Sequence, residues 1–283
     1  MDFRLKFTGE KANDGQLEFY DAAKSILGFE RSLALTAHFV LNGEIITQAP
    51  SLKGATILVK PPREGSWEIV ASIVAGMVAG GALGKDTVFG HLMWSAYDYV
   101  VSHTLGFHVE FEKTLVASHR EFLAQRRKDP DLAISEGRLD SLIEKTESAL
   151  IEMHRPIVWS GTAGQAVILD VSANEIGVPF TAETYEYAAN LERENVSINA
   201  VGIVSSYNVN TFKGRIFIPD EERAVPFILS DDSRNREQIN KIVTSLRSNA
   251  IDRRANKIFV GMSAFRENSS TGRLKSLYVL NVE

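Results

Sequence analysis

A stretch rich in aromatic, amide and cationic side chains near the C-terminus is the part of the chain best suited to binding chemistry. It spans residues 207–215, and a second short basic stretch spans residues 272–275. Aromatic rings beside Lys and Arg on a strand provide a stacking surface for bases and a path for backbone phosphates. We therefore predict a site for single-stranded nucleic acid. Its predicted residues are Tyr207, Asn208, Asn210, Phe212, Lys213, Arg215, Arg253, Arg254, Arg273 and Lys275.

The same residues also have simpler structural roles, which the sequence leaves open. Asn208 and Asn210 suit a tight turn, because short amide side chains bond to nearby backbone groups. The Lys and Arg residues would equally suit the solvent-facing side of a strand.

The elements that must position these residues follow one another in a recognisable order. Alternating apolar residues and turn signals predict strands at residues 196–207, 212–218 and 224–229, then a helix at 234–249, then strands at 257–265 and 274–282. Three strands, a helix and two strands are typical of an OB-type barrel, and SH3-like barrels share parts of this order. We predict that residues 195–283 form a small basic β-barrel, OB- or SH3-like.

The remainder of the chain predicts an α+β protein with three further segments. Residues 1–64 are expected to form an N-terminal α/β unit, with a hairpin at Asn42-Gly43. Residues 65–155 are expected to be mainly helical. Residues 156–194 are expected to supply connecting strands and a helix.

Residues 69–84 form an uncharged run of small and apolar residues, which we expect to be a Gly/Ala-rich apolar helix. Gly76, Gly80 and Gly84 recur every four residues, a pattern that lets helices approach closely. The run reaches about 24 Å as a helix, less than the ~30 Å of a bilayer core. Two readings follow: a buried helix, or a membrane segment that lines an oligomeric pore.

Composition excludes several classes of chemistry. The chain has no cysteine, which excludes disulfides, thiolate metal sites and cysteine nucleophiles. Neither a phosphate-binding loop of the GxxxxGK type nor an HExxH metal motif occurs, and the histidines lack ligand spacing. We expect no enzyme activity, no cofactor and no metal site. Residues 197–283 carry 13 Lys/Arg against 9 Asp/Glu, whereas residues 1–196 carry 18 against 27, so an anionic partner is expected at the C-terminal part.

Four short motifs carry a resemblance that runs over most of the chain. They are Gly65-Ser66-Trp67-Glu68, Ser206-Tyr207-Asn208-x-Asn210-Thr211-x-Lys213-Gly214-Arg215, Pro226-Phe227-x-Leu229 and Gly272-Arg273-Leu274-Lys275. With them the chain resembles uncharacterised bacterial proteins found near defence genes. Its layout also resembles the effectors of the Hailong antiphage system. These are membrane ion channels held shut by single-stranded DNA oligomers that a partner nucleotidyltransferase makes.

The resemblance and the residues together lead to one functional expectation and one alternative. The expectation is a non-enzymatic, oligomeric antiphage effector in the inner membrane with a cytoplasmic body. It would be an ion channel gated by a nucleic-acid oligomer at the C-terminal barrel. Its implied partners are other copies of the chain, single-stranded DNA or a nucleotide oligomer, membrane lipid and a nucleotidyltransferase. The alternative is a soluble cytoplasmic protein that binds oligonucleotides or acts as a scaffold.

Overall fold

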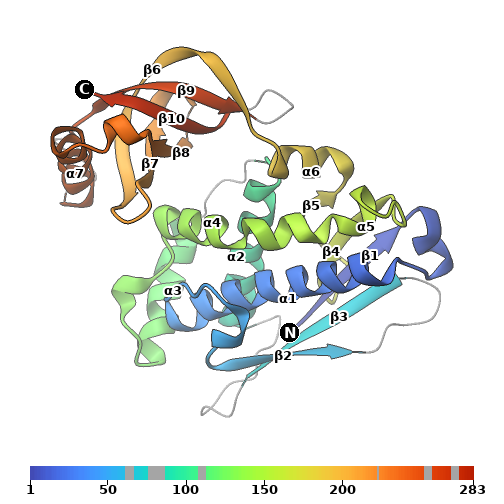
Figure 1. Cartoon of the computed structure of the whole chain (residues 1–283). Helices are drawn as coiled ribbons and strands as arrows, with labels where there is room; N and C mark the ends of the chain where they lie inside the picture. The colour runs from blue at the N-terminus through green and yellow to red at the C-terminus, as the bar shows by residue number, and fades with distance from the viewer. Residues whose placement is uncertain (61–66, 76–86, 108–112, 222, 252–256, 269–273) are drawn as a thin grey trace. The chain divides into compact units, whose positions relative to one another are not determined.

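The fold is known from a computed structural model, which describes residues 1–60, 67–75, 87–107, 113–221, 223–251, 257–268 and 274–283. The chain forms two compact units, unit 1 at Met1–Ala189 and unit 2 at Asn190–Glu283 (Figure 1). Strands from the predicted segments 1–64, 65–155 and 156–194 share one sheet of unit 1, and only the last five residues of the third segment, 190–194, belong to unit 2. The α+β class is confirmed.

Unit 1 is built on an antiparallel sheet with the strand order β2-β3-β1-β4-β5. The strands are β1 (Asp2–Thr8), β2 (Ala55–Lys60), β3 (Trp67–Ala75), β4 (Gln165–Leu169) and β5 (Glu175–Phe180). Alternation along β1 buries Phe3, Leu5 and Phe7 against the helices, since successive strand residues face opposite sides of a sheet. The other side of β1 is polar.

Helices cover the buried side of this sheet (Figure 1). They are α1 (Phe19–Asn42), α2 (Val88–Thr104), α3 (Lys113–Gln125), α4 (Glu136–Met153), α5 (Arg155–Val158) and α6 (Ala182–Ala189), with the short helices η1 (Glu10–Asp14), η2 (Ala49–Ser51) and η3 (Pro130–Leu132). The long helix α1 begins where the Glu18 carboxylate accepts a bond from the Asp21 amide. It ends at Gly43, whose φ of 71° is the left-handed cap conformation that glycine favours. The predicted hairpin at Asn42-Gly43 is therefore wrong: the same residue pair caps a helix.

The described part of the apolar run, residues 69–75, forms a strand where a helix was predicted. These residues lie in β3, which pairs with β1 on one side and β2 on the other. β-Branched residues such as Ile69, Val70 and Ile73 favour this extended conformation. Gly76, Gly80 and Gly84 lie outside the described residues.

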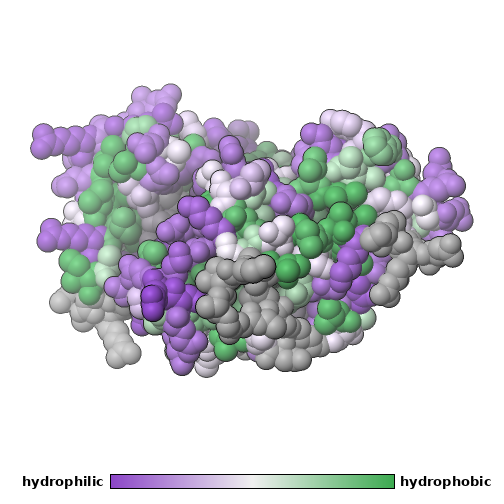
Figure 2. Space-filling view, turned by 90° about the horizontal axis from the view of Figure 1, so that it is seen from below, coloured by the Kyte–Doolittle hydropathy of each residue, from purple (hydrophilic) through white to green (hydrophobic). Residues whose placement is uncertain are grey.

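The predicted transmembrane helix and ion channel are contradicted by the structure. Among the helices of the described residues, none combines the length and apolarity that crossing a bilayer requires. The structure likewise gives no support to an inner-membrane location. Hydrophobic residues do reach the surface of the open face of the sheet, where Leu58 is 52% and Val74 is 44% exposed. Figure 2 looks from the side on which β2 and β3 lie in Figure 1 and shows hydrophobic side chains gathered among hydrophilic ones.

Unit 2 is a five-stranded sheet that closes on itself in the order β10-β8-β7-β6-β9. Its elements are β6 (Glu192–Asn208), β7 (Lys213–Ile218), η4 (Pro219–Glu221), β8 (Arg223–Leu229), η5 (Asp231–Ser233), α7 (Arg236–Ile251), β9 (Val260–Asn268) and β10 (Leu274–Val282). Neighbouring strands are antiparallel except for the parallel pair β8 and β10. The predicted order of three strands, a helix and two strands is found in unit 2.

The closed sheet surrounds a core to which α7 contributes one face. Ile242 of α7 is fully buried, and Ile239 and Leu246 pack against the same cluster of strand residues. The Ser245 hydroxyl accepts a bond from the Val204 amide and donates one to the Ile258 carbonyl. These bonds fix α7 to β6 and to the segment just before β9, and the main packing of this helix is on β6, β9 and β10 and not on β7 and β8.

Candidate nucleic-acid interface

The outer face of β7 carries two cations and an aromatic ring in one row, which we call the β7 outer row: Lys213, Arg215 and Phe217. The alternate residues Ile216 and Ile218 are buried in the barrel core. Strand alternation therefore places all three members of the row on the opposite, outward side. Residues two apart on a strand are about 6.8 Å apart, so the row presents its groups at regular intervals along β7.

Neighbouring strands extend this surface with polar and small apolar residues. Asn208 and Ser206 of β6 pair with Lys213 and Arg215, and Ile228 and Pro226 of β8 pair with the same two residues on the other side. The Asn208 side chain accepts bonds from the amides of Asn210 and Thr211 at 2.9 and 3.4 Å. The turn role that the sequence left open for Asn208 is thus present. Asn210 is exposed within that turn.

Tyr207 lies on the inner side of the sheet, half-buried against the barrel core, and not in the β7 outer row. Its ring stacks on Phe227, with centroids 6.3 Å apart, and Phe227 is almost fully buried. An irregularity in the β6–β7 pairing between Val204 and Ser206 shifts the alternation, so that Tyr207 pairs with Gly214 on the inner side. Burial raises the pKa of the Tyr207 hydroxyl, and the nearby Arg234 charge opposes part of that rise.

Phe212 is likewise engaged at the end of the turn. The Arg234 guanidinium lies 4.8 Å from the centre of its ring, and the Phe212 carbonyl accepts a bond from the Leu229 amide. Its φ of 55° is unusual for a residue with a side chain and orients the ring at the turn. The aromatic group that shares a face with Lys213 and Arg215 is therefore Phe217. Strict alternation from Lys213 would have identified it in the sequence.

The remaining predicted residues fall in two groups. Lys275 lies on β10, two strands from β7, and is half-buried. Extending the parallel register back from the Leu277–Phe227 pair places Lys275 level with Val225, which pairs with Ile216, between Arg215 and Phe217. Arg253, Arg254 and Arg273 lie outside the described residues.

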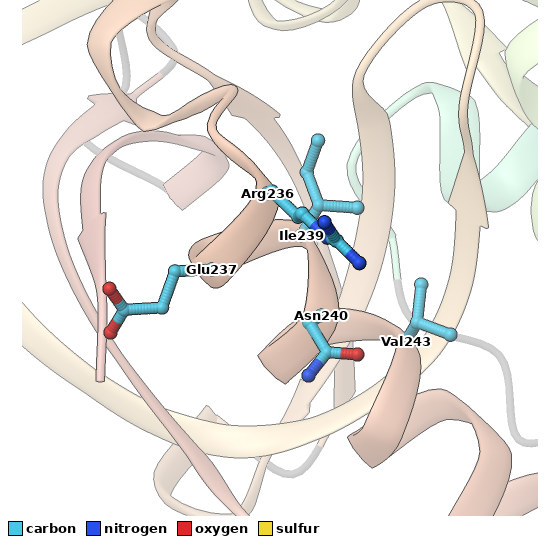
Figure 3. A pocket seen from close by; sticks show the side chains of 5 residues that line it. All are labelled: Arg236, Glu237, Ile239, Asn240 and Val243. Atoms are coloured by element: carbon cyan, nitrogen blue, oxygen red, sulfur yellow. The ribbon is translucent and has the colours of Figure 1, made fainter.

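A shallow pocket on α7 is separate from the β7 outer row. It is lined by Arg236, Glu237, Ile239, Asn240 and Val243, all on the first half of the helix (Figure 3). Glu237 pairs with Lys241 one turn along α7. The lining combines one cation, one carboxylate, one amide and two aliphatic residues, so it offers no concentration of charge for an anionic ligand. Within the described residues no cluster of three or more His, Asp or Glu side chains could hold a metal ion.

Unit 1 contains a buried histidine–threonine pair that resembles a base beside a hydroxyl. His154 Nδ1 lies 2.9 Å from the Leu150 carbonyl, and Nε2 lies 3.1 Å from the Thr184 hydroxyl. The same hydroxyl accepts a bond from the Thr181 amide at the start of α6. Both side chains are buried, so the pair joins α4 to α6 and has no access to a substrate.

This histidine predicts how unit 1 responds to acid. Burial lowers the pKa of His154 from 6.5 to about 4, although bonds to backbone carbonyls oppose part of that shift. The unfolded chain then binds the extra proton between pH 6.5 and 4, so stability is full above pH 6.5 and falls as pH drops through that window. We expect a loss of about 3 kcal/mol from this residue. Urea unfolding at pH 7 and pH 4 should show the difference between wild type and His154→Gln shrinking by that amount. A difference that stays constant with pH would contradict this assignment.

The two units correspond to two sequence families. Residues 3–189 match a domain of unknown function (DUF7946), and the chain belongs to this family. Residues 197–283 match a family of unknown function (DUF7947). Neither the curated proteins nor the solved structures contain a match to the chain.

Proposed function

We propose that unit 2 is an OB-type barrel that binds single-stranded nucleic acid across the outer faces of β7 and β8. The strand order supports the OB type. The first strand of the unit, β6, pairs with the second, β7, and with the fourth, β9, while the third, β8, pairs in parallel with the fifth, β10. The helix between the third and fourth strands agrees with that type. OB folds bind oligonucleotides on the face of their second and third strands, which here are β7 and β8.

The β7 outer row is the observation that carries the proposal. Its spacing is close to the separation of neighbouring phosphates in an extended single strand, so Lys213 and Arg215 can each meet one phosphate. Phe217 then offers a ring on which a base can stack, and such stacking is tolerant of base identity. The basic balance of residues 197–283 favours the approach of a polyanion.

A titration of the full chain with a fluorescently labelled 12-nucleotide deoxythymidine strand tests this proposal. Anisotropy at 50 mM salt should rise with protein concentration, and a duplex of the same length should bind more weakly because its bases are already stacked. Absence of single-strand binding at 50 mM salt would reject the proposal. The resemblance to defence-associated families and the expected lack of enzyme activity stay predictions.

A further inference from the structure

Unit 1 contains a concentration of cations that contrasts with its acidic composition. Five basic residues surround the connection between α1 and β2, at residues 43–54, and we call them the basic cluster: Lys53, Arg126, Arg127, Lys128 and Arg138. They come from the connection itself, from the end of α3 and from the start of α4. Residues 1–196 as a whole carry 27 Asp/Glu against 18 Lys/Arg. A local reversal of this sign would focus an anionic ligand on the cluster.

Several independent contacts show that the cluster converges on one place. Arg138 donates to the Gly43 carbonyl at one end of the connection, and a Cβ on Gly54 at the other end would lie 3.4 Å from Arg126 Nη2. Between them, the Lys53 amide donates to His38 Nδ1 at 3.1 Å. The charges of Lys53 and Lys128 both lower the pKa of His38, after the larger effect of burial, so both ammonium groups lie near this ring.

Two guanidinium groups of the cluster have unsatisfied hydrogen-bonding capacity. The Nε atoms of Arg126 and Arg138 are buried and have no acceptor. Their side chains are held in place by aromatic rings, Arg126 over Phe122 and Arg138 over Phe39, at 5.6 and 5.5 Å. Within the described part of the chain none of the five cations pairs with a carboxylate. The nearby Glu44 carboxylate lies 3.8 Å from His38 Nε2, and the Asp129 carboxylate, next to Lys128 in the chain, accepts a bond from the Asp131 amide.

Arg127 has a backbone conformation that glycine usually adopts, although an arginine occupies this position. Its φ of 56° is left-handed, and the bonds from the Lys128 amide to the Leu123 carbonyl and from the Arg127 amide to the Ala124 carbonyl form the helix-ending motif that usually has glycine at this position. An arginine in this conformation is strained relative to glycine. Arg127 is exposed, so the chain places this cation at the cluster at a cost in local stability.

We infer that the basic cluster is a binding site for phosphate groups. Planar guanidinium groups with unused N–H donors match the oxygens of a phosphate, and ammonium groups supply further charge. Four or more cations without carboxylate partners suit a ligand with at least two negative charges, such as a diphosphate or two neighbouring phosphates of a strand. This inference does not depend on the proposed function of the barrel.

The test uses the full chain and the variant Arg127→Gly, which removes charge without endangering the fold. Because glycine relieves the strain at this position, Tm should rise by about 2 °C. Calorimetric titration at 20 mM salt should nevertheless show pyrophosphate binding weakened about threefold. Lys53→Gln combined with Lys128→Gln should weaken it at least tenfold. Lys11→Gln removes one charge from an exposed lysine of η1, so it is the matched control for Arg127→Gly and should leave binding unchanged.

A second arm distinguishes the two sources of phosphate. The 12-nucleotide deoxythymidine strand is titrated into a chain whose barrel carries Lys213→Glu and Arg215→Glu, so that binding reports on unit 1. If pyrophosphate binds and the substitutions at Lys53 and Lys128 weaken that binding, the cluster is a site for a free phosphate ligand. If only the strand binds, and the same substitutions weaken its binding, the cluster is a site for a phosphodiester. If neither ligand binds, or if the variants bind both as tightly as the wild type, the basic cluster is not a phosphate site.

Discussion

Reversing two charges on β7, with Lys213→Glu and Arg215→Glu together, should weaken binding of the 12-nucleotide strand more than 100-fold. Each residue loses one charge-assisted contact to a phosphate and gains a repulsive carboxylate, and a combined loss of about 3 kcal/mol already corresponds to that factor. Anisotropy titration of wild type and variant at 50 mM salt measures the change. Circular dichroism should remain unchanged, because both side chains lie on the outer face while Ile216 and Ile218 keep the core.

The matched control for this variant changes the same amount of charge elsewhere in unit 2. Arg236→Glu with Arg247→Glu alters two exposed arginines on α7, which packs against β6, β9 and β10. A purely general effect of net charge would weaken binding equally in both double variants. The proposed interface predicts a loss of less than about fivefold for the α7 pair, because only long-range attraction is reduced.

Gly28→Val should destabilise unit 1 by about 3 kcal/mol, which corresponds to a fall in Tm of roughly 6–12 °C. Gly28 lies on α1 where this helix crosses α4, and a Cβ there would be 2.4 Å from the Ala149 carbonyl oxygen. One turn earlier on α1, the Ser25 hydroxyl donates to the Met153 carbonyl at 3.1 Å, so the two helices cannot easily separate. Valine would force them apart.

Thermal unfolding followed at 222 nm measures this effect. Leu27→Val, at the preceding and largely exposed position, controls for the lower helix propensity of a β-branched residue. We expect that control to shift Tm by less than about 3 °C. Equal shifts for the two variants would mean that the contact between α1 and α4 at Gly28 is unimportant.

The contrast between Gly28 and the glycines of the apolar run shows where sequence patterns mislead. Spacing of four residues at Gly76, Gly80 and Gly84 suggested close helix packing, yet the run begins as a strand in the middle of a sheet. A short apolar run has no periodicity that separates a buried strand from a buried helix. Its strand partners lie at positions 2–7 and 55–60, which local patterns cannot reveal. Gly28 is a single glycine in a long amphipathic helix, and its role depends on α4, more than 100 residues later.

The C-terminal unit was predictable because its information is local. Clean alternation at residues 213–218 and the turn at Asn208 gave the strands and their order. The prediction that Tyr207 shares a face with Lys213 and Arg215 failed for a reason that the sequence does not show. The irregularity after Val204 moves the Tyr207 side chain to the inner side of the sheet. The basic cluster of unit 1 was visible only in part, as the Arg126–Lys128 run. Lys53 and Arg138 join it through the tertiary fold.

The salt dependence of single-strand binding by the full wild-type chain tests the central claim most directly. Two phosphate contacts, at Lys213 and Arg215, predict a slope of about −1.4 for the logarithm of the association constant against the logarithm of salt concentration. Affinity for the 12-nucleotide strand should then fall about sevenfold between 50 and 200 mM salt. A slope near zero, with affinity unchanged over that range, would contradict phosphate recognition by the outer face of β7.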